Sequence, residues 1–567
     1  MKHPRIQSLS LDDQKNHFVV GIDFGTTYSG VAFAYSGDTD TIGVIKQWPG
    51  AKQRTSEKIG SLIIYEGDGT ISAWGAQAEN KPRKSGQTKA RWFKLLLDDS
   101  QSNYLVTATQ YATKPFGMTA VEVATDYLRL INTHLINHLK TTYGSGLFEC
   151  TPIEYFVTVP AIWSDKAQAI TRNAAINAGI QGKLEIVREP EAAAIACAHS
   201  GHLIFEEGDR FLVCDAGGGT VDLISYEVTT PRPLKMKEIT IGTGGLCGAT
   251  YLDREFEKLL REKLSKYGDQ FLNEKSLASL LQDFDEYLKV NFGEDEDEDE
   301  FSIILRGCDI DEDEEAGISA GCLIFTRDEI VQVFDPVINK IIQLIEEQVT
   351  NSKETIKTIF LVGGFGSNGY LRNRIQGRYP HISVQQPVDA WSAVVRGAVI
   401  HGLREKIVTA RHLRRSYGVS CNSQWDPLIH DLDQYYVCEF TGHARANDCM
   451  SWYARMGHEV QHGQSIKFPF CHKVGEKKDR YVYDLLCSDI ENPPRRASHS
   501  SVTALGQVVV NLTDDQKQLY RTRNSVTDGF EYYELCIDIS MKFTASLLKF
   551  EILLDGKVAG EAVIKYE

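Results

Sequence analysis

Two short stretches of this chain carry the same turn, an Asp followed two residues later by Gly, placed between two β-prone runs. The first is GIDFGTTYSG, starting at Gly21, and the second is VCDAGGGTVD, starting at Val213, so Asp23 and Asp215 lie 192 residues apart. Such a turn offers backbone N–H groups to phosphate oxygens while its carboxylate faces a phosphate-bound metal ion. The duplication predicts two similar halves that clamp one nucleotide between them.

Length and composition indicate a globular chain with more than one core. It has 567 residues, of which 42% are hydrophobic, and chains of this size divide into several compact units. No apolar run approaches the roughly twenty residues that span a bilayer, and segment 1–16 lacks the apolar centre of a signal peptide. We therefore expect no membrane span and an intracellular location, cytoplasmic or nuclear. The twelve cysteines form no CxxC pair, which predicts mostly reduced, buried thiols and no zinc site.

Most of the net charge of −16 comes from one segment. Residues 294–315 contain thirteen acidic residues and one Arg, so the rest of the chain carries only about −4. We interpret this acidic segment as a solvated loop, with an acidic docking segment as the alternative. Basic and aromatic residues do not cluster in the pattern of a nucleic-acid interface, so no nucleic-acid partner is expected.

Strand and helix patterns alternate over the first 400 residues. Each Asp-x-Gly turn lies between two apolar runs; these runs are Phe18–Ile22, Ser29–Tyr35, Phe211–Asp215 and Val221–Val228. A strand is expected to end at Pro160, and Ser164 is expected to cap the helix Asp165–Ala178. Further helices are predicted over Glu191–His199, Leu252–Tyr267, Ser276–Phe292 and Arg327–Gln348, followed by a buried strand at Ile359–Val362. The repetition predicts two α/β lobes, over 17–205 and 206–403.

The chain after Gly402 has the pattern of β-structure. From Leu535 to Phe543 apolar residues alternate with polar ones, as in a half-buried strand. A second strand, Leu548–Leu554, precedes the hairpin turn Asp555-Gly556, after which the chain returns as a strand. We predict a β-rich C-terminal domain over 413–567, joined to the lobes by the basic segment Arg404–Arg415.

Five motifs occur in a fixed order. They are Asp-x-Gly-Thr-Thr from Asp23, Val-Pro-Ala from Val159, Glu-Pro-x-Ala-Ala-Ala from Glu189, Asp-x-Gly-Gly-Gly-Thr-x-Asp from Asp215 and Val-Gly-Gly from Val362. Each alone is weak, because such turns are common without a ligand. Together, over residues 17–403, they resemble the ATPase domain of the heat-shock protein 70 family. The resemblance implies a two-lobed, actin-like (ribonuclease H-like) α/β ATPase domain that binds ATP or ADP with Mg²⁺.

The resemblance also implies roles for single residues around the phosphates. The two phosphate loops match Gly25, Thr26, Thr27 and Tyr28, and Gly217, Gly218, Gly219 and Thr220. Asp23 would hold a water of the magnesium shell, and Asp215 would face the metal from the other lobe. Lys94 resembles the lysine that stabilises the transferring phosphoryl group, and Glu189 resembles the acid that positions water. Metal, positive charge and oriented amides supply most of the stabilisation in phosphoryl transfer, which agrees with these roles.

For the nucleoside, the resemblance implies contacts from Gly248, Glu286, Lys289, Gly363, Gly364 and Phe365. Glu286 and Lys289 are three residues apart and so share one helix face. The chain departs from the family at Val290, where an Arg usually stacks on adenine, and at Phe365 and Cys247, which replace smaller residues. We therefore expect a rebuilt base pocket.

Each of these assignments has a structural alternative. Asp23 and Asp215 can each cap a turn, and Lys94, beside Phe93 and Leu95, can be a helix residue whose charge reaches solvent along its apolar stem. A purely structural hydrogen bond or ion pair is likewise the alternative for Glu189, Thr220, Asp222, Glu286 and Lys289.

The resemblance weakens beyond the lobes. The segment HGLREKIVTARHLRRSYG has no counterpart of the family's short acidic, leucine-rich linker. The sequence ends at Glu567, soon after the last predicted strand, which leaves no room for the family's helical lid. The chain therefore resembles a divergent, lidless branch of the family, for which a conventional chaperone cycle is not implied.

Three functions are compatible with these features. The first is slow, Mg²⁺-dependent ATP hydrolysis coupled to lobe closure, with a chaperone-like or client-sensing role in which a peptide or protein client adds to the β domain as a strand. The second is a nucleotide-gated scaffold with little or no hydrolysis. The third, a sugar kinase, is less favoured because Gly217–Thr220 followed by Asp222 resembles the heat-shock group more closely.

Overall fold

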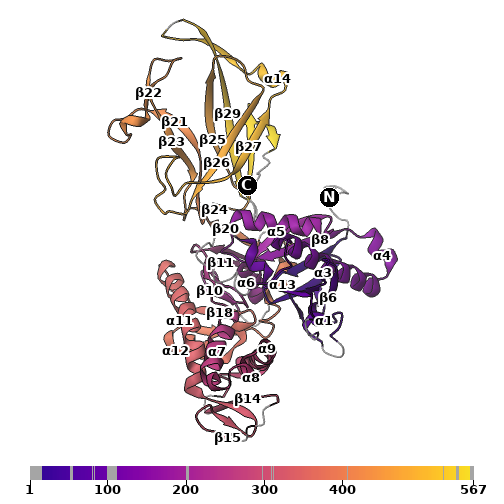
Figure 1. Cartoon of the computed structure of the whole chain (residues 1–567). Coiled ribbons are helices and arrows are strands. Elements are labelled where there is room, and N and C mark those ends of the chain that lie inside the picture. The colour runs from indigo at the N-terminus through magenta and orange to yellow at the C-terminus, as the bar shows by residue number, and fades with distance from the viewer. Residues whose placement is uncertain are drawn as a thin grey trace, which may run out of the picture. The chain divides into compact units, whose positions relative to one another are not determined.

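The computed structural model describes residues 16–51, 55–79, 81, 84–98, 112–199, 204–295, 298–307, 310, 312–404, 407–527, 529–543 and 548–561. Figure 1 shows the whole chain, which forms two compact units. Unit 1 consists of Met1–Ile224 and Thr243–Ile407, and unit 2 of Ser225–Gly242 and Val408–Glu567. Within the described ranges, no helix combines the length and the apolar character needed to cross a membrane.

The first large sheet of unit 1 contains the first glycine turn. Its strands follow the order β3-β2-β1-β8-β9, and β4 pairs with β2. The strands are β1 Phe18–Asp23, β2 Tyr28–Tyr35, β3 Asp38–Val44, β4 Lys58–Gly60, β8 Ile153–Val159 and β9 Lys183–Arg188. β1 is antiparallel to β2 and parallel to β8, and every residue of β1 is buried. A strand covered on both faces is continuously apolar, as the run FVVGI is.

The second large sheet contains the second glycine turn. Within unit 1 its order is β19-β18-β10-β11, with β13 also paired to β11. The strands are β10 Arg210–Ala216, β11 Val221–Pro231, β13 Thr243–Gly245, β18 Thr358–Val362 and β19 Ser383–Gln385. β10 is parallel to β18, and β18 is parallel to β19. Both sheets therefore place a glycine turn between two neighbouring strands, and the predicted α/β fold is confirmed.

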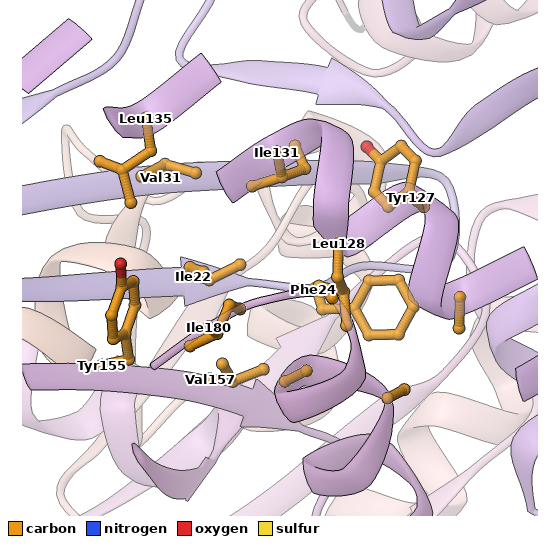
Figure 2. Close-up of a cluster of buried hydrophobic side chains, with 14 of the residues drawn as sticks. Ile22, Phe24, Val31, Tyr127, Leu128, Ile131, Leu135, Tyr155, Val157 and Ile180 are labelled. Carbon is orange, nitrogen blue, oxygen red and sulfur yellow. The ribbon is translucent and has the colours of Figure 1, made fainter. Parts of the chain in front are cut away.

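Helix α3 (Ala120–Tyr143) covers one face of the first sheet. It begins with a capping box in which Thr119 Oγ1 accepts from Glu122 N and Glu122 Oε2 accepts from Thr119 N. Figure 2 shows Leu128 and Ile131 of this helix packed against the sheet, and both are fully buried. Each such side chain contributes about 1.5–3 kcal/mol of hydrophobic stabilisation.

The other helices of unit 1 include the five that were predicted, one of which is interrupted. They are α1 Gly75–Glu79, α4 Ser145–Cys150, α5 Asp165–Asn177, α6 Glu189–His199, α7 Thr250–Lys263, α8 Asp269–Leu272, α9 Glu274–Asp283, α10 Lys289–Asn291, α11 Arg327–Asn351, α12 Gly369–Arg378 and α13 Ala393–Leu403. Ser164 caps α5 as predicted, accepting from Ala167 N. The helix predicted over Ser276–Phe292 is broken by a π-helical turn, Phe284–Leu288.

Two small sheets complete unit 1, and one of them corrects a prediction. They are β6-β5-β7 (Ile71–Trp74, Leu62–Tyr65, Thr88–Arg91) and β14-β17-β16-β15 (Glu300–Ile304, Cys322–Thr326, Ile318–Ser319, Glu312–Asp313). The acidic segment 294–315 was expected to be a loop, and this is wrong for β14 and β15. Phe301 and Ile303 are buried, because their alternation in EFSII forms one apolar face despite the adjacent charge.

Unit 2 contains two antiparallel sheets that share one apolar core. The first has the order β22-β23-β21-β26-β27 (Tyr435–Val437, Ala444–Ala454, Ser416–Gln424, Arg480–Ser488, Thr503–Asn511). The second has the order β25-β29-β30-β31 (Ser465–Val474, Glu531–Phe543, Leu548–Leu554, Lys557–Glu561), with β28 (Arg521–Asn524) paired to β29. A short helix, α14, spans Asp514–Lys517. The β-rich C-terminal region is thus confirmed, including the alternating strand that ends at Phe543.

Unit 2 also contains residues 408–415 of the predicted linker, and part of this segment is a strand. β11 continues beyond Ile224 and pairs with β12 (Leu234–Glu238), which pairs in parallel with β20 (Val408–His412). β20 in turn pairs with β24 (Glu459–Gln461). Glu238 fastens β20 by accepting from the backbone N–H of His412 at 3.0 Å. The basic linker segment therefore takes part in a sheet.

One disulfide departs from the expected reduced state of the cysteines. Cys471 on β25 and Cys536 on β29 are directly opposite in the strand register and are joined by a disulfide. They are 65 residues apart in sequence, and only the register of these two strands brings them together. The sequence spacing of the cysteines gave no indication of this pair.

The contact between α6 and α13 generates a stability prediction. A Cβ on Gly397 would lie 1.7 Å from the carbonyl oxygen of Ala192, so the helices approach more closely than any side chain permits. We expect Gly397→Ala to lower the free energy of unfolding by about 2–3 kcal/mol, because the helices must move apart. Urea denaturation of the purified protein measures this change.

Gly377, on α12, is the matched control because no atom lies within 4 Å of the Cβ that a substitution would add. Gly377→Ala is expected to leave stability unchanged or to raise it by up to about 1 kcal/mol, since Ala is the better helix former. Equal effects of the two substitutions would contradict the close-packing account.

Candidate functional site

The first glycine turn is held rigidly between β1 and β2. Gly25 N donates to Ser29 Oγ at 3.2 Å, and Ser61 Oγ donates to the carbonyl oxygen of Gly25 at 2.7 Å. The two hydroxyls, Ser29 Oγ and Ser61 Oγ, lie 2.9 Å apart. Asp23, the last residue of β1, is buried and accepts from Thr158 Oγ1 at 3.3 Å. Local hydrogen bonds therefore fix both the turn and its carboxylate.

The second glycine turn is held through its carbonyl oxygens. Gly217 N donates to Thr220 O at 3.0 Å, which closes the turn. The carbonyl oxygens of Gly217, Gly218 and Gly219 accept from the backbone N–H groups of Ala249, Thr250 and Gly248, respectively, at 2.9–3.3 Å. The residues that lead into α7 thus occupy the acceptors of the turn. This arrangement favours backbone donors for a ligand on the other side.

The two turns touch each other. A Cβ on Gly218 would lie 2.2 Å from Thr27 Oγ1, and a Cβ on Gly219 would lie 2.8 Å from Thr26 Oγ1. Around this contact lies one cavity lined by Asp23, Gly25, Thr26, Thr27, Tyr28, Lys58, Lys94, Glu189, Asp215, Gly217, Gly218, Gly219, Thr220, Gly363, Gly364, Trp391 and Val394. Fourteen of these seventeen residues are among those singled out in the sequence.

Lys94 and Glu189 form a buried ion pair in the cavity. Lys94 lies on a 3₁₀ turn, Phe93–Leu97, and its Nζ is 2.6 Å from Glu189 Oε1 at the start of α6. The ammonium is also 5.3 Å from the ring centre of Trp163, within range of a cation–π interaction. Lys94 is only 2% exposed, so its charge does not reach bulk solvent. The alternative of a snorkelling surface lysine is therefore wrong for Lys94.

Asp215 faces the same cavity from the second sheet. Gly363, with a φ of +83°, packs against it so closely that a Cβ would lie 2.5 Å from Asp215 Oδ1. Burial, followed by repulsion from Glu189, raises the pKa of Asp215 well above its usual range, while Lys58 acts in the opposite direction. The cavity thus concentrates acidic groups that a cation would stabilise.

Asp222, on β11, has a structural contact. Its Oδ1 accepts from the backbone N–H of Ile162 at 3.1 Å, which ties β11 to the loop after the Val-Pro-Ala motif. Thr220, by contrast, lines the cavity.

Four residues predicted to contact nucleotide do not line this cavity. They are Gly248, Glu286, Lys289 and Phe365. Lys289 is bound by Asp253, at 2.8 Å, and by Asp285, and Glu286 accepts from Gln282. Phe365, in the turn that follows β18, is buried, and Val290 is 55% exposed. Lys289 thus pairs with two aspartates, rather than with Glu286.

Comparison with known proteins agrees with this geometry. The family model for Hsp70 protein matches residues 19–409, which contain every residue of the cavity. The chain belongs to the Hsp70 family. It is 24% identical to heat shock 70 kDa protein 12B of Homo sapiens, over 84% of this chain and 81% of that protein, and 25% identical to the human protein 12A, over 75% of each.

A shorter match covers the chaperone protein HscA of Pectobacterium carotovorum, 29% identical over 38% of this chain and 33% of that protein. Membership of the Hsp70 family supports ATP binding by this chain.

Three residues of the Hsp70-type cavity were missed in the sequence: Lys58, Trp391 and Val394. Lys58 lies in a strand of three residues, too short to show a period. Trp391 Nε1 would be 4.0 Å from a Cβ on Gly364, and its ring meets that of Tyr28 edge-on. Lys58 follows Glu57 and precedes Ile59-Gly60-Ser61, so no apolar run or motif marks it in the sequence.

The buried carboxyl of Glu189 generates a pH prediction for the ligand-free protein. Burial raises its pKa from the usual 4.5 to about 7, although Lys94 opposes the shift. The folded state therefore retains a proton that the unfolded chain has lost. The corresponding stability is fully present below pH 4.5 and is lost as pH rises through about 7. We expect Glu189→Gln to flatten this decline, by at most about 1.4 kcal/mol per pH unit.

Unfolding free energies measured at several pH values between 4.5 and 7.5 test this. Glu346→Gln is the control, because Glu346 forms a surface pair with Arg378 and is 53% exposed. The unfolding free energy of Glu346→Gln is expected to change with pH in the same way as that of the parent protein. A Glu189→Gln curve equally parallel to the parent would contradict the raised pKa.

Proposed function

We propose that unit 1 binds ATP and ADP with Mg²⁺ and hydrolyses ATP slowly. The observation that carries the proposal is the contact between the two glycine turns around a cavity that also holds Lys94 and Glu189. Each turn comes from a different sheet, so a bound nucleotide joins both halves of the fold. Closure of the lobes would then accompany binding.

The cavity suits phosphate groups because its walls are backbone rather than side chain. Gly218, in the second glycine turn, and Gly363, in the turn after β18, leave no room for a Cβ, so no side chain of theirs covers the peptide groups. Backbone N–H groups in such turns bind phosphate oxygens without cost in side-chain entropy. Gly217, Gly219, Gly25 and the hydroxyl groups of Thr26, Thr27 and Thr220 extend the same surface.

The donor set also suits Mg²⁺. Asp23 and Asp215 would hold the ion, directly or through water, because Mg²⁺ is usually bound by one or two carboxylates together with phosphate oxygens. When bound, the ion neutralises charge on the phosphates. Asp215, whose pKa is raised by burial, would gain a cationic partner.

Lys94 and Glu189 would have separate roles in hydrolysis. A lysine donates to the phosphoryl oxygens as a compact positive charge. Once Lys94 turns from Glu189 to the phosphate, the Glu189 carboxylate is free to accept from water and orient it toward the phosphorus. The turn Gly363-Gly364 and the Tyr28–Trp391 pair lie at the same cavity and would border the ribose and base.

A nucleotide-gated scaffold is the second candidate. In support of it, the two ammonium groups of the cavity are already neutralised, Lys94 by Glu189 and Lys58 by Asp23. If these pairs persist when nucleotide is bound, neither lysine is available to the transferring phosphoryl group. Binding without turnover would result.

Unit 2 supports a proposed client-binding role. β22 (Tyr435–Val437) is an edge strand of its sheet, and Tyr435 and Val437 are exposed. Leu428 and Leu432, on the preceding loop, are 91% and 86% exposed. An apolar edge strand accepts an extended peptide by strand addition. We propose that a peptide or protein client binds there in a chaperone-like or client-sensing role.

Single-turnover hydrolysis distinguishes ATPase from scaffold. We expect the parent protein to convert bound ATP to ADP, and Lys94→Ala to slow the step at least about a hundredfold, because a buried donor to the phosphoryl group is lost. Asp215→Ala is expected to reduce both hydrolysis and magnesium-dependent binding. Radiolabelled ATP with rapid quench measures the rate, and ADP calorimetry measures binding.

Lys258→Ala is the control because Lys258, on α7, is 71% exposed and pairs only with its helix neighbour Glu255 among the salt bridges of the described residues. It should hydrolyse ATP at the parent rate. Tight nucleotide binding without turnover by the parent would instead establish the scaffold.

Client binding is tested with a peptide array probed in the presence of ATP or ADP. We expect extended apolar peptides to bind, with affinity that depends on the nucleotide. Val437→Lys is expected to reduce binding at least tenfold, because a charge on an edge strand opposes strand addition. Lys517→Ala, on the exposed α14, should leave binding unchanged. An array without nucleotide-sensitive binding would contradict the client role.

A further inference from the structure

Lys58 is a second buried ammonium at the phosphate cavity. It is the first residue of β4, opposite Gly30 of β2, and its side chain is 9% exposed. Its Nζ lies 2.7 Å from Asp23 Oδ2, while Lys94 Nζ contacts Glu189. The cavity therefore contains a lysine beside the first glycine turn in addition to the proposed phosphoryl-binding lysine.

The backbone around Lys58 is fixed. Ser56 Oγ donates to the Lys58 carbonyl oxygen at 2.7 Å, and Tyr127 OH donates to the carbonyl oxygen of Gly60 at 3.1 Å. The adjacent Glu57 is bound by Lys46 at 2.9 Å and by Arg396 at 3.3 Å. These contacts hold β4 against β2, so the ammonium is positioned before any ligand arrives.

The geometry of the ammonium permits a second partner. An ammonium group has three donors, and the contact with Asp23 uses one of them. The oxygens of a phosphate at the first glycine turn would meet the same ammonium, because Lys58 and the turn residues line one cavity. A lysine in such a position binds phosphate as a point charge.

Charge balance gives this lysine a specific consequence. The acidic residues that line the cavity are Asp23, Glu189 and Asp215, and the basic ones are Lys58 and Lys94. A polyphosphate adds further negative charge, which ordinarily makes binding depend on a divalent cation. A fixed ammonium at Asp23 offsets part of that repulsion within the protein itself.

We propose that Lys58 is a built-in counter-ion for the nucleotide phosphates and that this chain binds ADP well without a divalent metal. The inference rests on the proposed nucleotide site and specifies how that site tolerates charge. Hydrolysis still requires the metal. Lys58 makes the affinity for ADP less dependent on Mg²⁺.

The experiment is calorimetry of ADP binding to the full chain, in excess Mg²⁺ and in EDTA. We expect the parent Kd in EDTA to lie within tenfold of the Kd in Mg²⁺, a difference of at most about 1.4 kcal/mol. Lys58→Met, which keeps the length of the stem, should increase the ratio of the two constants at least tenfold, mainly by weakening metal-free binding. Lys58→Arg should retain the parent ratio, because it retains the charge.

Lys183→Met is the matched control. Lys183 lies on β9 of the same sheet, is 62% exposed and pairs with Glu154 rather than with Asp23, so its loss should leave the ratio unchanged. Thermal unfolding of each variant shows whether it is folded. If Lys58→Met does not fold, the role of Lys58 is still tested by the ratio of the two Kd values in the parent protein and in Lys58→Arg.

The outcomes separate two failures. A parent Kd that rises more than tenfold in EDTA, or a ratio unaffected in folded Lys58→Met, overturns the role of Lys58 and shows that its pair with Asp23 is purely structural. ADP binding in Mg²⁺ would then still support the proposed function. No ADP binding under either condition overturns both.

Discussion

The contact between the two glycine turns is the constraint on which the rest of the site depends. Gly218 lies against Thr27, and Gly219 lies against Thr26, with no space for a Cβ at either glycine. This contact brings Asp23 and Asp215 to one cavity although 192 residues separate them. The buried strands β1 and β10 set the position of each turn, and hydrogen bonds from Ser61 and from residues 248–250 fix its shape. The packing of two sheets thus becomes a binding surface.

The cavity is held together by charges as well as by backbone. Lys58 pairs with Asp23, and Lys94 pairs with Glu189, in surroundings where an unpaired charge would be strongly destabilising. Within the described part of the chain, neither lysine forms a salt bridge with Asp215. Burial raises the pKa of Asp215. The cavity therefore contains two ion pairs and one further carboxyl, whose raised pKa favours its neutral form. A cation bound beside that carboxyl would stabilise its ionised form.

The sequence predicted those parts of the structure that depend on local pattern. The alternation in β29, the Ser164 cap of α5 and the ordered glycine motifs led to the α/β fold and to most of the residues of the cavity. Features that depend on register or tertiary packing were not predictable. Lys58 reaches Asp23 because β4 pairs with β2, and Lys289 meets Asp253 across helices. Cys471 faces Cys536 because β25 pairs with β29, and the strands within the acidic segment pair with strands outside it, β14 with β17 and β15 with β16.

The route from the site to unit 2 is covalent and does not depend on the linker sequence typical of the family. β11 begins at Val221, directly after the second glycine turn, and from Ser225 onward the strand belongs to unit 2. There it pairs with β12, and β12 pairs with β20 of the linker segment. Residues 217–220 are therefore joined through β11 and β12 to the strand that contains part of the linker, although HGLREKIVTARHLRRSYG lacks the acidic, leucine-rich pattern.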